Sequence, residues 1–260
     1  MNEQAMQVED LTKEQIARVE AERAGWRVVV PAFDHIVPDV EHMLDMLQRN
    51  GITVIRYVGN SDIARARSLM GSQMLADESV KRILWIDSDQ LLDARDCVRL
   101  LLSRREFVTA VAPQRKMAGK LLIDWGPQGS PESVKIGKDG GEYRAFRCGF
   151  GAVAMDRSVL EKAAQDLPQV TCDRQVFYPM FLPSIREDDQ LPTGWAYLGE
   201  DYAFCERVAE AGVQLFVDTS LRVFHFGRHP FAWEDCLLAP RRFLTLELEK
   251  SERAPEPGAN

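Results

Sequence analysis

The sequence predicts an α/β fold, with a mixed, mainly parallel sheet flanked by helices and an irregular insertion in its second half. Apolar, β-branched runs alternate four times with segments of helical periodicity between Trp26 and Ala112, a pattern typical of parallel strands joined by helices. A chain of 260 residues can also bury a sizeable core. After Pro113 the alternation gives way to stretches rich in glycine, lysine and proline, which predicts the insertion.

The first half of the chain contains the regular elements. Apolar runs predict four strands, at 26–30, 52–57, 82–86 and 107–112, the first of which is expected to stop at Pro31. Helical spacing of apolar residues predicts a helix after each of the first three strands. Ligands of such sheets bind at the carboxyl ends of the strands. This rule places Pro31, residues 57–62 and residues 87–89 along one edge of the sheet.

The second half of the chain continues with one more strand, at 150–155, and a helix from Arg157. Residues 166–196 contain four prolines, and we expect an irregular insertion on the substrate side. A helix then begins near Gly199, and within 212–227 two strand-like runs flank a short polar turn.

The domain boundaries follow from composition. We expect a charged N-terminal arm or helix over residues 1–24, in which Thr12 is a helix cap, and one domain over 25–249. A tail over 250–260 is expected to be disordered because it contains proline, glutamate and glycine.

Charge and cysteine content limit the classes of function and compartment. The net charge of −8 argues against non-specific binding to a phosphate backbone, although basic residues between Arg115 and Lys120 leave a local patch open. Five scattered cysteines without a C-x-x-C pair predict free thiols. The sequence contains neither a signal-peptide core nor an apolar run long enough for a transmembrane segment, so we expect a cytoplasmic protein.

The motif Asp87-Ser88-Asp89 follows an apolar strand and places two carboxylates at the sheet edge. Hard cations such as Mg²⁺ and Mn²⁺ prefer oxygen ligands and bridge carboxylates to phosphates. The alternative is that Asp87 caps the next helix and Asp89 is solvated. A phosphatase nucleophile also stands in a D-x-D motif, but the threonine or valine expected two residues further on is Leu91 here, a poor fit.

Two later segments carry further polar candidates. Glu200 and Asp201 open the helix after Gly199, where acidic side chains favour the helix dipole and a carboxylate can also accept a proton. His225 stands at the end of the last strand-like run, where it is either structural or a third metal ligand.

The order of these three elements resembles the GT-A (Rossmann-like) glycosyltransferases, and most closely family 2 with its phage and bacterial relatives. The resemblance rests on D-S-D, G-E-D-Y-x-F-C-x-R and a strand ending in H-x-G, and it covers roughly residues 28–227. It implies a nucleotide-sugar donor and a Mn²⁺ or Mg²⁺ ion held by Asp89, Asp87 and His225. It also implies that Asp201, beside Glu200, is the catalytic base of an inverting reaction.

The resemblance further implies the donor-binding residues. Asn60-Ser61-Asp62-Ile63-Ala64-Arg65 is similar to an S-D-x-x-R element that grips a uridine nucleotide, so the donor is expected to be a UDP-sugar. Helix capping is the structural alternative for Asp62. The remaining positions expected at the donor, from the nucleobase to the sugar, are Pro31, Phe33, Ser88, Gly149 and Gly151.

Several alternatives stay open. A retaining glycosyltransferase would not need Asp201 as base. A nucleotidyltransferase usually begins with a glycine-rich, basic loop, whereas residues 31–35 contain neither glycine nor lysine. A non-enzymatic nucleotide-sugar-binding scaffold is the third alternative. The acceptor hydroxyl could belong to a saccharide, a small molecule, a protein or a modified DNA base, and Trp195 and Tyr197 are candidates to stack on it.

Overall fold

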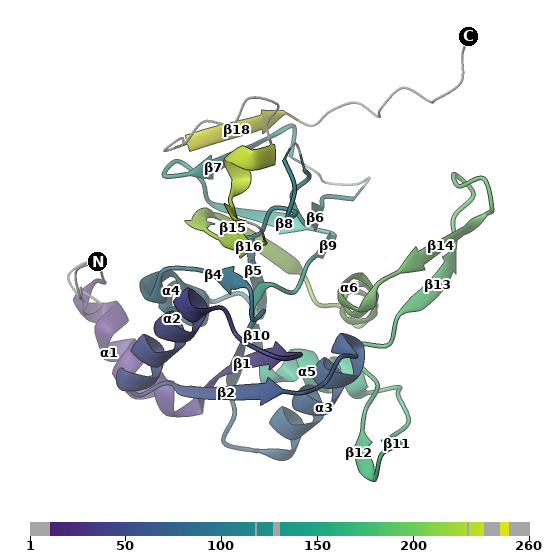
Figure 1. Ribbon diagram of the computed structural model, residues 1–260, viewed down its shortest axis with the longest axis horizontal. Helices are drawn as coiled ribbons and strands as arrows, with labels where there is room; N and C mark the ends of the chain where they lie inside the picture. Colours follow the sequence, from purple (N-terminus) through teal and green to yellow (C-terminus); the bar gives the residue numbers. More distant parts are fainter. Residues whose placement is uncertain (1–10, 118, 127–130, 228, 237–244, 250–260) are drawn as a thin grey trace.

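A seven-stranded mixed sheet forms the centre of the molecule (Figure 1). The computed structural model describes residues 11–117, 119–126, 131–227, 229–236 and 245–249. The strand order is β2-β1-β3-β10-β5-β15-β8. In that order the strands span Thr53–Val58, Trp26–Ala32, Arg82–Ile86, Ala152–Asp156, Phe107–Val111, Leu215–Arg222 and Glu142–Ala145.

Five of the seven strands of this sheet run in the same direction, and β10 and β8 run against them. Strand β1 pairs in parallel with β2 and β3, and β15 pairs in parallel with β5. Strand β10 lies antiparallel between β3 and β5, and β8 lies antiparallel to β15 at the edge. The predicted α/β fold with a mixed, mainly parallel sheet is therefore confirmed.

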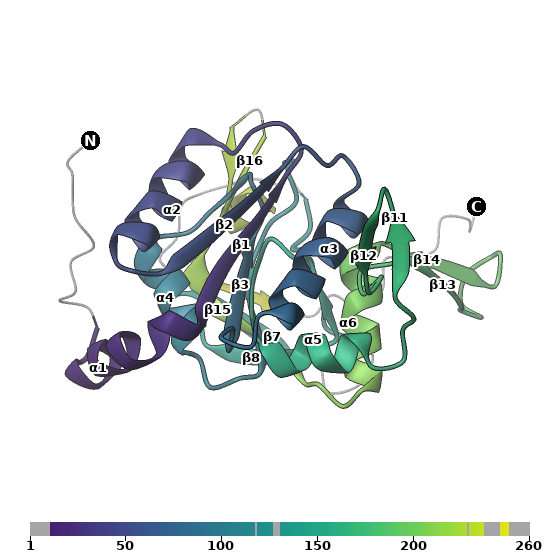
Figure 2. The same ribbon diagram turned by 90° about the horizontal axis from the view of Figure 1, so that it is seen from below.

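Helices cover both faces of the sheet (Figure 2). Helices α2 (Pro38–Arg49) and α4 (Ala94–Leu102) pack on one face, together with α1 (Lys13–Glu22) beside α4. Helices α3 (Ile63–Ala76), α5 (Arg157–Ala164) and α6 (Glu200–Glu210) pack on the other. Alternation along the strands divides the core, since side chains at successive positions point to opposite faces. Val28 and Leu84 enter the first cluster, and Val29 and Trp85 enter the second.

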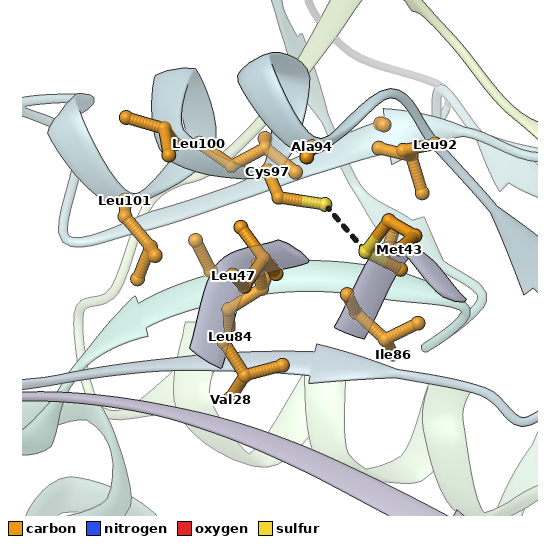
Figure 3. Close-up of a cluster of buried hydrophobic side chains, with 14 of the residues drawn as sticks. Val28, Met43, Leu47, Leu84, Ile86, Leu92, Ala94, Cys97, Leu100 and Leu101 are labelled. Carbon is orange, nitrogen blue, oxygen red and sulfur yellow. Dashed lines mark hydrogen bonds between the residues drawn. The ribbon is translucent and has the colours of Figure 1, made fainter. Parts of the chain in front are cut away.

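The first cluster is closely packed (Figure 3). Strand residues Val28 and Leu84 meet Leu47 of α2 and Leu101 of α4, all of them buried. The Cys97 thiol lies among them and donates to the sulfur of Met43 at 3.6 Å. All five cysteines are free, as expected, and three of them are buried.

The predicted cap at Thr12 and the predicted helix start near Gly199 are confirmed, and Asp62 takes its alternative, structural role as a cap. Thr12 caps α1 by accepting the Gln15 N–H, and Asp62 caps α3 by accepting the Arg65 N–H. Pro38 is the first residue of α2, and Gly199 is the N-cap of α6. Thus the N-terminal arm is helical over Lys13–Glu22, while residues 1–10 and the predicted tail 250–260 lie outside the described residues.

Two strand boundaries differ from the prediction. Strand β1 continues through Pro31 to Ala32 because beyond Val29 it pairs with β2 alone, so a position without an N–H donor is tolerated. The expected polar turn within 212–227 is instead part of β15, whose pairing with β5 shifts between Asp218 and Arg222. A bulge of this kind accommodates short polar residues within a strand, which is why the sequence alone suggests a turn here.

The insertion at 166–196 contains two short hairpins where the sequence predicts irregular chain. Strands β11 (Val170–Cys172) and β12 (Gln175–Phe177) form the first, and β13 (Ser184–Glu187) and β14 (Trp195–Leu198) form the second. The other short strands are β4 Gln90–Leu91, β6 Ile123–Asp124, β7 Ser133–Gly137, β9 Arg147–Cys148, β16 Phe224–Phe226, β17 Pro230–Phe231 and β18 Thr245–Glu249. In the part of the chain that the structure describes, no helix has both the length and the apolar character required to cross a bilayer.

Candidate active site

The D-S-D motif lies at the carboxyl end of β3, where the sequence predicts it, and backbone bonds from remote segments hold it. The Asp87 N–H donates to the carbonyl oxygen of Gly151 at 3.0 Å, next to β10. The Phe226 N–H, in β16, donates to the carbonyl oxygen of Asp89 at 2.7 Å. The turn is therefore tied on two sides to chain that follows it by more than sixty residues.

His225 faces the second aspartate of the motif. Strand β16 pairs with β4, which puts His225 opposite Gln90. Its Nδ1 lies 2.8 Å from the carbonyl oxygen of Pro113, and because a carbonyl only accepts, Nδ1 carries the proton. The other ring nitrogen, Nε2, lies 3.5 Å from Oδ2 of Asp89. A backbone carbonyl that fixes the tautomer in this way is common for histidines that ligate metals through the second nitrogen.

A buried arginine joins the motif to the acidic start of α6. Arg67 of α3 is only 3% exposed. Its Nη2 donates to Oδ1 of Asp87 at 2.6 Å, and its Nη1 donates to Oε1 of Glu200 at 2.7 Å. The guanidinium also lies 5.3 Å from the ring centre of Phe150. Asp87 and Glu200, 113 positions apart in the chain, therefore share one cation.

Asp201 follows Glu200 in the first turn of α6, and Gly149 lies beside it. The Tyr202 N–H donates to Oδ1 of Asp201 at 2.7 Å. A methyl group added at Gly149 would lie 3.7 Å from Oδ2 of Asp201. Burial, and then the neighbouring charge of Glu200, raise the pKa of Asp201 to about 6. Asp201 therefore releases its proton just below neutral pH, as a general base requires.

The two aspartates of the motif differ in their electrostatics. Burial raises the pKa of Asp87 in spite of the Arg67 cation. Burial alone would also raise the pKa of Asp89, but the interactions with the His225 side chain and with the nearby Arg115 cation outweigh it and lower this pKa. Arg115 Nη1 lies 2.7 Å from Oδ2 of Asp89. Across the described residues, no three His, Cys, Asp or Glu side chains stand close enough together to hold a metal ion as they lie.

The predicted nucleotide-binding residues lie at the same edge of the sheet but have other contacts. Pro31 is buried within β1, whereas Phe33 is exposed. Asp62 caps α3, and Arg65 pairs with Asp173 at 2.6 Å, in the turn of the first hairpin. Asp62 and Arg65 line a pocket of about 450 Å³ that is otherwise mostly apolar.

Gly151 is required by packing. A methyl group added there would lie 1.9 Å from the side-chain nitrogen of Gln90, which is buried. The absence of a side chain at Gly151 therefore makes room for Gln90, next to the aspartates. Gly149 lies beside Asp201 instead, so the two glycines contact different side chains.

The sequence prediction missed Arg67 and Arg115, the two cations of the site. A signal for Arg67 exists: it precedes Met70 and Met74 by three and seven residues, and that spacing puts it on the same helix face as these buried side chains. A charged residue on a buried face needs a partner of opposite charge. Arg115 stands in the glycine- and lysine-rich stretch, where no periodicity indicates its position.

No protein-family model matches the chain, and no curated protein matches it. Solved structures are similar at low identity. The STIV protein A197 is 14% identical, with 90% of this chain and 98% of that chain covered and a TM-score of 0.49. A UDP-glucose pyrophosphorylase complexed with UDP-glucose is 10% identical, with 81% and 80% covered and a TM-score of 0.36. A glycosyltransferase involved in the glycosylation of the major capsid of PBCV-1 is 12% identical, with 52% and 61% covered and a TM-score of 0.28. Likeness at this level does not identify a family.

Proposed function

We propose that this protein is a metal-dependent glycosyltransferase of the GT-A type, which moves a sugar from a UDP-sugar to an acceptor hydroxyl. One observation carries the proposal: three chemically suited groups from distant parts of the chain meet at the carboxyl edge of the sheet. Asp89 faces His225 at 3.5 Å. The neighbouring Asp87 shares Arg67 with the acidic turn that contains Glu200 and Asp201.

The residues present suit a Mn²⁺ or Mg²⁺ ion. Asp89 offers carboxylate oxygens, which suit both ions, and His225 offers Nε2, a nitrogen ligand that favours a transition-metal ion such as Mn²⁺ over Mg²⁺. Arg115 now pairs with Asp89, but its side chain is about half exposed and can swing away. Asp87 is held by buried Arg67 and is the weaker ligand candidate. A bound ion would neutralise charge on the departing nucleoside diphosphate.

Asp201 is the proposed base. At neutral pH its carboxylate is ionised and can accept the proton of an acceptor hydroxyl as that oxygen attacks the anomeric carbon, which inverts the configuration. Glu200 is fixed by Arg67, so its proposed role is to position the turn and to raise the pKa of Asp201. Gly149 lies beside Asp201 and close to Leu122, so a side chain at this position would crowd the turn that carries the base.

The donor is proposed to enter across the edge formed by Asp62, Arg65 and Ser88. Arg65 can pair with phosphate once it leaves Asp173, whose own side chain is largely exposed. Phe33, which is exposed just beyond β1, offers a ring for the nucleobase.

The test is release of UDP from a panel of UDP-sugars with Mn²⁺, with and without EDTA. We expect turnover that EDTA abolishes and that Asp89→Ala reduces at least ~100-fold. Asp96→Asn, which changes a carboxylate of α4 outside the site, is the matched control and should leave turnover unchanged.

Three outcomes would each contradict a part of the proposal. Pyrophosphate release from UTP and a sugar 1-phosphate, without UDP release from any UDP-sugar, would identify a nucleotidyltransferase. Turnover that persists in EDTA would show that the reaction does not need a metal ion. An NMR spectrum of the product in which the donor's anomeric configuration is retained would reject Asp201 as the base of a single displacement.

A further inference from the structure

The β13–β14 hairpin projects from the body of the molecule next to the acidic turn (Figures 1 and 2). Its strands pair antiparallel, with Ile185 opposite Tyr197 and Glu187 opposite Trp195. Within the described ranges, each strand pairs only with the other. An isolated two-stranded hairpin is marginally stable in water, so contacts with the body must hold it in place.

One face of the hairpin provides that contact. Arg186 Nη1 lies 3.2 Å from Oε1 of Glu206 in α6, and Leu198 is buried. Alternation along a strand puts Arg186, Ala196 and Leu198 on this inner face. The hairpin is therefore anchored to the same helix that begins with Glu200 and Asp201.

The opposite face is apolar, aromatic and open. Ile185, Trp195 and Tyr197 are 68%, 54% and 72% exposed, and by the same alternation they share this face with the carboxylate of Glu187. Contiguous exposed apolar side chains of this kind mark binding surfaces. We call this surface, made of these four residues, the aromatic face.

The strand that carries Trp195 and Tyr197 continues directly into the turn with the proposed base. Tyr197 precedes Asp201 by four residues and Trp195 precedes it by six. At about 3.3 Å per extended residue, the Cα atoms of Tyr197 and Trp195 lie at most roughly 13 and 20 Å from the Cα atom of Asp201. A ligand stacked on both rings must therefore be longer than a single small ring to reach the reacting centre.

The charge of the hairpin selects among acceptors. Glu187, Asp188 and Asp189 stand near its tip with Arg186 as their single basic neighbour, and the whole chain carries a net charge of −8. An acidic surface repels a phosphate backbone. A neutral saccharide is not repelled: the apolar C–H face of a sugar ring stacks on an aromatic ring, and Glu187 can accept hydrogen bonds from its hydroxyls.

We infer that the aromatic face holds a neutral oligosaccharide acceptor, so that its terminal hydroxyl reaches Asp201. This inference rests on the proposed function for the meaning of that hydroxyl, but binding itself can be measured without turnover. Trp195 and Tyr197 bind the sugar rings, and neither takes part in the chemical step.

The test uses the full chain with Mn²⁺ and UDP, titrated with maltotriose, cellotriose and chitotriose. Trp195 is the natural probe, since Trp26, Trp85 and Trp233 are buried and Trp125 is half-buried. We expect saturable protection of its fluorescence from acrylamide by at least one trisaccharide. Saturation-transfer NMR should report the same binding in Trp195→Phe, which keeps a ring.

Truncation separates stacking from a general surface effect. Trp195→Ala and Tyr197→Ala should each weaken trisaccharide binding roughly two- to tenfold, the value of one aromatic contact. Val176→Ala removes an exposed apolar side chain from the other hairpin and is the matched control, with unchanged binding expected.

The inference is overturned if no trisaccharide binds saturably at tens of millimolar, or if the three alanine variants bind alike. It is also overturned if a serine- and threonine-rich peptide, and no saccharide, protects Trp195, because the acceptor would then be a polypeptide. Hydrolysis of the UDP-sugar by water, measured in parallel as release of UDP, tests the proposed function separately. If no UDP is released while saccharide binding is intact, the transferase is refuted and the aromatic face remains a saccharide site.

Discussion

Replacement of Arg67 by methionine tests the charge balance of the site most directly. The change keeps a long apolar side chain of similar reach in α3 and removes the cation that Asp87 and Glu200 share. Two carboxylates, 26% and 23% exposed, would then face each other without a counter-charge. We expect the folded protein to be destabilised.

The magnitude follows from the burial of the group. Removal of one partner from a buried ion pair costs about 3–5 kcal/mol. Because both carboxylates keep some access to water, the lower end, about 3 kcal/mol, is the appropriate value. For a chain of this size, 1 kcal/mol lowers Tm by roughly 2–4 °C, so Tm should fall by about 6–12 °C.

The pH dependence gives a second readout. Without the cation, the pKa of Asp87, already raised by burial, rises further above its unfolded value. A carboxyl whose folded pKa is raised opposes folding when it is ionised and ceases to do so when it is protonated. The difference in Tm between wild type and Arg67→Met should therefore be larger at pH 8 than at pH 5.

Thermal unfolding by circular dichroism measures both effects, with Arg82→Met as the control. Arg82 is also buried and pairs with a carboxylate, Asp156, but at the opposite end of β3. We expect a comparable loss of Tm in this control and normal Mn²⁺-dependent UDP binding, which Arg67→Met should weaken. A Tm within about 2 °C of wild type for Arg67→Met would refute the reasoning on burial. Equal UDP binding by the two variants would show that Arg67 serves the fold alone.

Three further predictions concern single residues of the site. Turnover should rise with pH through about 6 as Asp201 ionises. Asp201→Asn should lose at least ~100-fold in turnover above that pH, and the loss should shrink at lower pH, where the wild-type carboxyl is itself protonated. A carboxylate whose folded pKa is raised opposes folding when it is ionised, so Asp201→Asn should be more stable than wild type at pH 8 and not at pH 4. The control is Asp96→Asn, because the pKa of Asp96 is also raised to about 6. This variant should gain the same stability and keep normal turnover. Arg115→Ala should tighten Mn²⁺ binding, measured by calorimetry, by roughly 1.4- to 5-fold. The reason is that an exposed ion pair worth about 0.2–1 kcal/mol no longer competes for Asp89. Unchanged or weaker binding would show that Arg115 does not compete with the ion. Gly151→Ala should lower the free energy of unfolding, measured with denaturant, by about 1–3 kcal/mol because the added methyl group would collide with Gln90. Gly141→Ala is the control and should leave stability unchanged, since no atom lies within 4 Å of the added group. Unchanged stability of Gly151→Ala would contradict the packing argument.

The regular elements could be predicted because their signals are local. The alternation of strands and helices, the cap at Asp62 and the start of α6 at Gly199 each depend on a few adjacent residues. The position of β10 could not be predicted in the same way. Its sequence is as apolar as a parallel strand, but its antiparallel place between β3 and β5 depends on where the chain returns after residues 113–150.

The same distinction between local signals and long-range contacts applies to the candidate site. The sequence indicates the carboxylates and His225 because acids that follow a buried strand, or open a helix, stand out from their surroundings. It does not indicate what neutralises them, since the partner of Asp87 lies twenty positions earlier and that of Asp89 twenty-six positions later. Pairing is a property of the folded chain, whereas the presence of an acid is a property of the sequence.

The two arginines that satisfy these acids are not equivalent, and this difference bears on the proposed metal. Arg67 is buried, holds two carboxylates and lies against Phe150, so its removal leaves charges that water reaches poorly. Arg115 is about half exposed and holds one, at a cost of at most about 1 kcal/mol when it leaves. A cation that arrives with a diphosphate can therefore displace Arg115 from Asp89, but not Arg67 from Asp87. We therefore propose that Asp89 and His225 would hold the metal, while Asp87 keeps the acidic turn of α6 in place through Arg67.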